Sequence, residues 1–256
     1  MSYTSPVTFP SKRWRLSIVG GLVLLVAGTS YWRPWRERLQ VFRAGGKGPP
    51  TLVLLHGFGS SAEEWLPYSK TVTRVSNVEF LFPEGPVLML RADGARVGHA
   101  WWDLKLAEHR RLGKPGVDLR DEDPASPARA GTLVQELLQG LRRPVILGGF
   151  SQGAMVACEV VFTSEVAVAA LVVLSGTPLH ETAWRAGMQA RQGLPVFMAH
   201  GRADDVLPFD LAEGLRDEMM AAGLDVTFVA FDGGHQIPGE VVAGLRAFLE
   251  RLSGHR

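Results

Sequence analysis

The stretch ILGGFSQGA, residues 146–154, decides the fold, because it sets one serine among three glycines at the end of an apolar run. Residues 144–147, which lead into the glycines, are apolar and partly β-branched, which is typical of a buried strand. Residues 155–158 after it are typical of a buried helix. A flexible linker would not have such neighbours. The sequence therefore predicts that Ser151 lies on a sharp turn from a strand into a helix.

From residue 39 onward, short apolar runs alternate with helical patterns, and most of the runs are continuous, as in strands that are covered on both faces. The expected strands are 51–55, 78–82, 145–149, 169–174, 196–200 and 227–231. One helix is expected to begin at Ser126 as N-cap, and another to end at Gly223. The pattern predicts one α/β domain over residues 39–256, with a mostly parallel sheet and helices on both faces.

Residues 1–38 differ sharply in composition, since residues 16–32 carry no charge and are apolar on every side of a helical wheel. A helix over them would be about 25 Å long, slightly less than a ~30 Å hydrocarbon core. Trp14 and Trp35 bracket it at interfacial depth. An uncleaved membrane anchor is favoured over a cleaved secretory signal, because no A-x-A cleavage site is present. The remaining domain is then expected outside the cytoplasm, periplasmic or exported.

Composition excludes several classes of protein. The net charge of +1 and the absence of a basic stripe interleaved with aromatic residues argue against nucleic-acid binding. Cys158 is the one cysteine, so no intramolecular disulfide can form, and its apolar neighbours predict a buried structural thiol. No CxxC or HExxH spacing occurs, so no metal site is expected.

Residues 149–153 match G-x-S-x-G, the nucleophile elbow. A tight turn forces the serine into a strained backbone geometry and lifts its hydroxyl above the sheet. Side chains at Gly149 and Gly153 would collide with the neighbouring strand and helix, and the helix N-terminus favours a developing negative charge. The motif predicts that Ser151 is a nucleophile, which needs a base to remove its proton.

In this arrangement the acid and then the histidine follow the serine in the chain. Asp204 is the expected acid, with Asp205 as the alternative, and His235 is the expected base. Asp232 could also orient His235, although it is only three residues away on the same loop.

The other histidines have simpler explanations. His56 and His200 are expected to form hydrogen bonds with the backbone in their turns, and His180 lies in a polar stretch with no expected catalytic role.

An oxyanion hole needs two backbone N–H groups. One is expected from Gln152, which follows the nucleophile. The other is expected from Phe58, which lies between Gly57 and Gly59 in the loop after the first long strand.

Six separated motifs resemble the phospholipase/carboxylesterase family, which includes acyl-protein thioesterases. In order they are LHGFGSSAEEW, PEGP, AWWDL, LGGFSQGAM, HGRADDVLP and GGHQIP, and the resemblance extends over about residues 50–252. The resemblance implies an α/β-hydrolase fold that acts on carboxylic esters or thioesters without a cofactor. The sequence departs from the family in its hydrophobic N-terminal segment and in the charged stretch between AWWDL and the elbow.

Carried over by position, the resemblance implies roles for particular residues. It implies Ser151 as nucleophile, Asp204 as acid and His235 as base. It places the oxyanion N–H groups at Phe58 and Gln152, and an acyl-binding cleft beside Trp101, Trp102 and Asp103.

The predicted function is a serine hydrolase that cleaves a small-molecule or lipid-like acyl ester through an acyl-enzyme. It is expected to meet the membrane through the N-terminal helix if that helix is not cleaved. The alternatives are a peptidase or a polyester or cell-wall-ester hydrolase on the same fold. A membrane-tethered, non-catalytic binding protein is a further alternative, which the intact set of Ser151, Asp204 and His235 disfavours.

Overall fold

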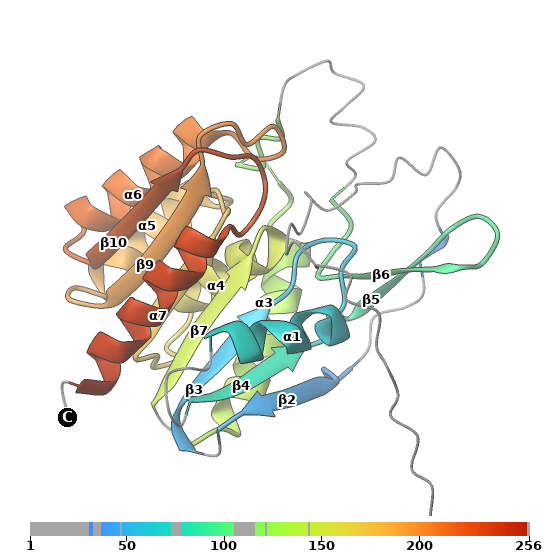
Figure 1. Cartoon of the computed structure of the whole chain (residues 1–256). Helices are drawn as coiled ribbons and strands as arrows, with labels where there is room; N and C mark the ends of the chain where they lie inside the picture. The colour runs from blue at the N-terminus through green and yellow to red at the C-terminus, as the bar shows by residue number, and fades with distance from the viewer. Residues whose placement is uncertain are drawn as a thin grey trace, which may run out of the picture.

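The structure is a computed structural model, and it describes residues 31–32, 37–46, 48–72, 78–104, 116–120, 122–142 and 144–254. Its centre is a seven-stranded sheet in the order β10-β9-β8-β7-β3-β4-β2 (Figure 1). The strands are β2 (Val41–Gly45), β3 (Gly48–Leu55), β4 (Val78–Pro83), β7 (Val145–Phe150), β8 (Ala170–Leu174), β9 (Pro195–Gly201) and β10 (Asp225–Phe231). Only β2 at one edge runs antiparallel to its neighbour, so the predicted mostly parallel α/β sheet is confirmed.

Helices cover both faces of this sheet and bury two separate cores (Figure 1). One face carries α3 (Ala125–Gln139), α4 (Gln152–Thr163), α5 (Glu181–Gln189) and α6 (Phe209–Ala221). The other carries α1 (Ala62–Val72) and α7 (Gly239–Gly254). Between the sheet and its flanking helices α3 and α5, α4 is buried from Gln152 to Phe162, which explains why its sequence is apolar on all sides.

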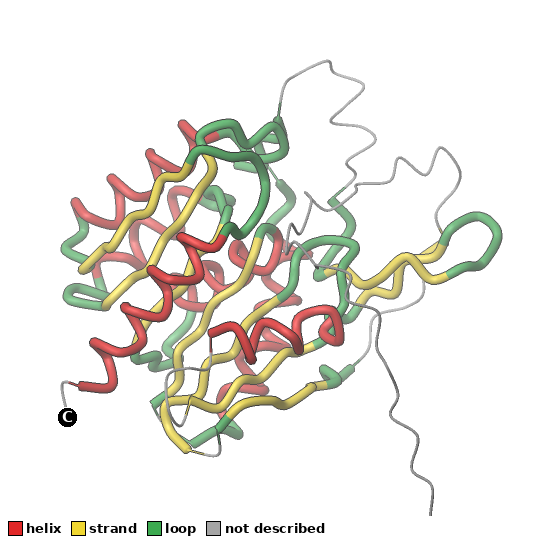
Figure 2. Tube along the Cα trace, in the orientation of Figure 1, coloured by secondary structure: helices red, strands yellow, loops and turns green. Residues whose placement is uncertain are grey.

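A second, three-stranded antiparallel sheet contains β1 (Tyr31–Trp32), β5 (Val87–Leu90) and β6 (Arg96–Ala100). The β5–β6 hairpin projects away from the main sheet (Figure 2). At its base, β6 returns the chain to the main domain, where His99 forms an antiparallel bridge with Ser60. The hairpin therefore meets the loop that follows β3.

All six expected strands are present, with ends that differ from the expected ones by a few residues. Gly223 follows α6 with a φ of +86°, as expected of the glycine after a helix. The start expected for α3 is wrong, because the helix begins at Ala125, before Ser126. The Ala125 N–H donates to Asp123 Oδ1 at 3.1 Å, so the side chain that satisfies this helix end lies upstream of Ser126.

The prediction of an N-terminal membrane anchor, and of a domain held outside the cytoplasm by it, is corrected. No helix among the described residues is both long and apolar enough to cross a membrane. The end of the expected helix, at Tyr31 and Trp32, is instead a strand that pairs with β5. The rest of the expected anchor, residues 16–30, lies outside the described residues.

Candidate active site

Ser151 lies between the end of β7 and the start of α4, with a φ of 54° and a ψ of −122°. A residue with a side chain in this region of backbone space costs about 1–3 kcal/mol, and such strain is concentrated at functional sites. The Ser151 N–H donates to Leu174 O at 2.8 Å, and Ser151 O accepts the Ala154 N–H at 2.9 Å. The neighbouring strand and the first turn of α4 thus hold the turn in this geometry.

The two glycines of the motif are required by their surroundings, as predicted. A Cβ at Gly149 would lie 2.3 Å from the carbonyl group of Gly153, and a Cβ at Gly153 would lie 2.3 Å from Leu55 O. Real Cβ atoms do not approach backbone atoms this closely. Strand β7, helix α4 and strand β3 can therefore meet around Ser151 only if both positions lack a side chain.

Asp204 and His235 come together although 31 residues separate them in the sequence. The His235 Nδ1–H donates to Asp204 Oδ2 at 2.7 Å. The other carboxylate oxygen, Oδ1, accepts the N–H groups of Val206 at 3.0 Å and Leu207 at 2.8 Å. The loop after β9 therefore holds the carboxylate through its own backbone and presents one oxygen to the imidazole.

His200, at the end of β9, completes the surroundings of this carboxylate. Its Nε2–H donates to Leu207 O at 2.9 Å and lies 3.3 Å from Asp204 Oδ2. Burial alone would raise the pKa of Asp204. The hydrogen bonds from His200, His235 and the Leu207 N–H, together with the electrostatic interaction with His235, outweigh it and hold the pKa well below its usual range. Asp204 is therefore ionised at neutral pH.

The two alternative acids lie in different surroundings. Asp205 is exposed. The Asp232 side chain is 99% exposed and lies 3.8 Å from Arg202. The carboxylate that the structure brings to His235 is that of Asp204.

The candidate nucleophile and the acid–base pair lie at the same end of the sheet, where the parallel strands have their carboxyl ends. Ser151, Asp204 and His235 follow β7, β9 and β10, and these strands run in parallel, so their carboxyl ends point to the same edge (Figure 1). The His235 ring packs against Phe150, the residue before the serine, with ring centroids 4.8 Å apart. All three predicted residues are almost fully buried.

The loop after β3 passes directly beside the elbow. A Cβ at Gly57 would lie 3.4 Å from Ser151 Cβ, and Gly59 has a φ of +76°. Phe58 lies between these two glycines. The positive φ of Gly59 therefore favours a glycine after Phe58, while a Cβ at Gly57 would lie 3.1 Å from the Phe150 ring, a tight contact.

His56 anchors this loop as a neutral imidazole. Its Nδ1–H donates to Gly57 O at 2.7 Å, and its Nε2 accepts the Gly85 N–H at 2.9 Å. Because it is buried, the pKa of His56 is lowered from 6.5 to about 4. Its expected role as a backbone-bonded histidine is confirmed.

Gln152, Trp101 and Trp102 form one buried unit. Gln152 Oε1 accepts the Trp101 N–H at 2.9 Å, and Gln152 Nε2 donates to Trp102 O at 2.9 Å. The exposed fraction of all three residues is 0%. The Gln152 side chain therefore binds the segment 101–102, which directly follows β6. That the two tryptophans border an acyl-binding cleft stays a prediction.

Two contacts at the site were not predicted from the sequence. Glu84 accepts the Ala62 N–H at 2.8 Å and lies 3.7 Å from His99 Nε2, in a buried cluster beside His56. The contact between His200 and Asp204 could have been suspected from their separation of four residues in HGRAD. The Glu84 contacts depend on strands that meet only in the fold.

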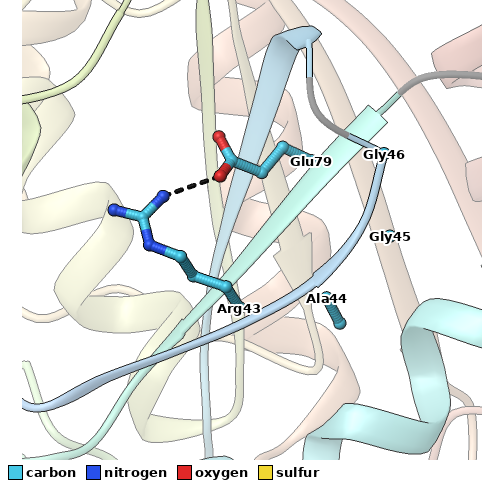
Figure 3. Close-up of a pocket in the computed structure, with 5 residues that line it drawn as sticks. All are labelled: Arg43, Ala44, Gly45, Gly46 and Glu79. Atoms are coloured by element: carbon cyan, nitrogen blue, oxygen red, sulfur yellow. Dashed lines mark hydrogen bonds and ion pairs between the residues drawn. The ribbon is translucent and has the colours of Figure 1, made fainter.

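An open pocket elsewhere contains none of the predicted residues. It lies where β2 and the start of β4 meet, and Figure 3 shows Arg43 directed at Glu79 across it, with 2.6 Å between Nη1 and Oε1. The carboxyl ends of the parallel strands are at the other end of the sheet. This pocket is therefore separate from the candidate active site.

A parallel sheet of this order, with a strained serine at an elbow and an aspartate–histidine pair at the same edge, defines the class of α/β-hydrolases. Residues 37–253 match the phospholipase/carboxylesterase family as a whole. The chain belongs to this family, and it is a hydrolase.

Individual relatives agree with this family. The chain is 27% identical to acyl-protein thioesterase 1 of Debaryomyces hansenii over 78% of its own length and 89% of that protein. It is likewise 27% identical to acyl-protein thioesterase 1 of Neurospora crassa, over 77% of its own length and 82% of that protein.

Solved structures support the fold. Esterase PE8 superposes with a TM-score of 0.70 at 24% identity, over 84% of this chain and 99% of that one. Acyl-protein thioesterase 2 of Zea mays superposes with a TM-score of 0.65 at 21% identity, over 88% of this chain and 99% of that one.

Proposed function

We propose that the protein cleaves carboxylic esters or thioesters through an acyl-enzyme formed on Ser151, with His235 as the base and Asp204 as the acid. The observation that carries the proposal is the 2.7 Å contact between His235 Nδ1 and Asp204 Oδ2, at the sheet edge where Ser151 is held at its elbow. The relatives named acyl-protein thioesterase make a thioester a substrate to test alongside oxygen esters.

The orientation of His235 determines the direction of proton transfer. Because Nδ1 donates to Asp204, the neutral ring carries its lone pair on Nε2. That nitrogen takes the proton from the Ser151 hydroxyl as its oxygen attacks the carbonyl carbon. The ionised Asp204 stabilises the imidazolium that forms.

The remaining steps return the enzyme to its starting state. The tetrahedral intermediate collapses, and the leaving alkoxide or thiolate takes the proton from His235. Water then attacks the acyl-enzyme while His235 removes its proton. The second tetrahedral intermediate releases the acid, and Ser151 regains the proton.

The negative charge on the intermediate needs donors that are already in place. The N–H of Gln152, at the N-terminus of α4, and the N–H of Phe58, in the loop after β3, are the proposed pair. Their backbone character means that an alanine at either position would leave the N–H in place.

A fluorophosphonate probe tests the nucleophile. The wild-type protein is expected to be labelled and to hydrolyse p-nitrophenyl esters, whereas Ser151→Ala should lose both properties while unfolding at the same urea concentration. Ser253→Ala is a control, since it removes an exposed hydroxyl in the last turn of α7. Equal labelling of the wild type and Ser151→Ala would reject the assignment.

A substrate panel tests the proposed chemistry of the substrate. Oxygen esters and thioesters of graded acyl length are compared with the corresponding amides. Turnover of the esters or thioesters above the amides is expected. Preferential amide cleavage would favour a peptidase instead.

A further inference from the structure

The two proposed oxyanion donors belong to separate segments of the chain. The Gln152 N–H is at the first residue of α4, and the Phe58 N–H is in the loop that follows β3. An oxyanion hole stabilises the transition state only if both N–H groups are held at the right separation before the reaction. Something must therefore fix the loop to the helix.

Trp101 contacts both segments. Its indole Nε1–H donates to His56 O at 2.8 Å, two residues before Phe58. Its backbone N–H donates to Gln152 Oε1 at 2.9 Å. Both hydrogen bonds are buried, so water does not compete with them.

The neighbours of Trp101 strengthen each of these two connections. On the helix side, Gln152 Nε2 also donates to Trp102 O, so the amide side chain forms two hydrogen bonds with the 101–102 segment. On the loop side, the Gly59 N–H donates to His99 O at 2.8 Å, just before Trp101 in the chain. The segment 99–102 therefore borders the loop and the helix at once.

The space around this segment leaves little room for adjustment. A Cβ at Gly98 would lie 2.1 Å from Gly59 O, which shows how closely β6 approaches the loop. The indole of Trp101 lies beside the His56 ring, with centroids 5.5 Å apart. The rigid indole carries an N–H at the edge far from its backbone, so it reaches from the Trp101 backbone to His56 O. Phenylalanine has no donor at this position.

We propose that Trp101 is a positioning residue that cross-links the two halves of the oxyanion hole. The proposal rests on the proposed function, since it concerns the same site. Loss of the indole N–H would let the loop shift relative to α4 and would weaken binding of the tetrahedral intermediate. Binding of the planar ground-state ester would change much less, so kcat falls and KM stays near its wild-type value.

Trp101→Phe tests the cross-link, with Trp184→Phe as the matched control. Trp184 on α5 is also 0% exposed, and its Nε1–H donates to Glu159 Oε2 of α4 at 2.7 Å. Both substitutions remove one buried indole hydrogen bond and the same volume. The free energy of unfolding of both variants is measured as well, so that a difference in kcat can be attributed to the position of the lost indole and not to a difference in stability.

The readouts are kcat, KM, the affinity for a boronic acid that forms a tetrahedral adduct on serine, and amide exchange of residues 57–60. For Trp101→Phe we expect kcat to fall by about 10- to 100-fold, a partial loss of one oxyanion donor. The affinity for the boronic acid should fall by a similar factor, and the loop amides should exchange faster. Trp184→Phe should keep the wild-type kcat and loop exchange.

Equal falls in kcat for the two variants, or an unchanged kcat in Trp101→Phe, would overturn the proposal. If Trp101→Phe does not fold, Gln152→Met decides it. That substitution removes both side-chain bonds to the 101–102 segment but keeps the backbone N–H at 152, and the same fall in kcat is expected.

Failure of the proposed function gives a different result. A wild-type protein that neither hydrolyses esters nor reacts with the fluorophosphonate would reject the hydrolase mechanism. In that case the amide exchange of residues 57–60 alone tests whether Trp101 links the loop to α4. Faster exchange in Trp101→Phe than in Trp184→Phe supports it, and equal exchange overturns it.

Discussion

Two of the carboxylate–imidazole pairs in the described part of the fold look alike in isolation. In one, His235 Nδ1 lies 2.7 Å from Asp204 Oδ2, and in the other His180 Nδ1 lies 3.0 Å from Glu159 Oε2. The first pair is in loops at the carboxyl ends of β9 and β10. The second joins the middle of α4 to the start of α5, where Trp184 donates to the same Glu159 oxygen.

The surroundings of each pair distinguish a candidate catalytic pair from a structural one. His235 packs on Phe150, next to the strained Ser151. Glu159 lies eight residues further along α4, which at about 1.5 Å per residue is about 12 Å from the elbow. A carboxylate–imidazole contact therefore indicates catalysis only where a nucleophile is held beside it.

The largest expected difference between the two pairs is in turnover. Asp204→Asn should lower kcat for an ester by about 10⁴-fold, because the imidazole loses its orientation and the partner of its positive charge. Glu159→Gln should leave kcat close to the wild-type value. Steady-state kinetics of the two folded variants checks this, and a comparable loss in both would remove the distinction.

A third buried imidazole, His56, sharpens the comparison because both of its ring nitrogens bond backbone groups. Its pKa is lowered from 6.5 to about 4, so between pH 4 and pH 6.5 the folded protein binds fewer protons than the unfolded chain. The stability from neutral His56 is complete above pH 6.5 and decreases as the pH falls toward 4, by about 3 kcal/mol. Urea unfolding at pH 7 and pH 4 should show this decrease in the wild type and a smaller one in His56→Gln.

The second pair should matter for stability. Glu159→Ala leaves the buried indole N–H of Trp184 and the part-buried His180 Nδ1 without their acceptor, which should lower the free energy of unfolding by about 1–3 kcal/mol. Urea denaturation measures this change. Replacement of Glu165, a residue just after α4, by alanine is the control, and an equal effect there would contradict the structural role.

The smallest expected effect is the acid dependence of stability from Asp204. Its pKa is held below the usual range in the fold, so its contribution is present above the unfolded value near 4 and is lost as the pH falls through the folded value. Asp204→Asn should therefore lose less stability than the wild type on acidification below pH 4. Thermal unfolding at pH 4 and pH 3 would test this, and parallel shifts in both proteins would refute it.

The sequence predicted the strands well because the central strands are buried on both faces, so their apolar runs are continuous. The elbow could also be predicted from the sequence, because its two glycines are required by steric collisions around the serine. The β5–β6 hairpin was not predicted, because its strands are short and partly exposed.

Contacts between distant segments could not be predicted from local patterns. His180 was expected in a polar stretch, and the structure pairs it with Glu159, 21 residues away, a contact that the local pattern does not indicate. The apolar segment before residue 33 was interpreted as a helix from hydropathy alone, yet Tyr31 and Trp32 pair with β5. Pairing with another strand has no signature in the composition of the segment itself.

The chain's one cysteine, Cys158, has consequences for how the protein can be handled. It is 1% exposed in the middle of α4, and burial raises the pKa of its thiol. A shielded, protonated thiol resists alkylation. A new cysteine at Met220, whose side chain on α6 is 55% exposed, would therefore take a maleimide dye selectively, and a fluorophore could be installed without first removing the native cysteine.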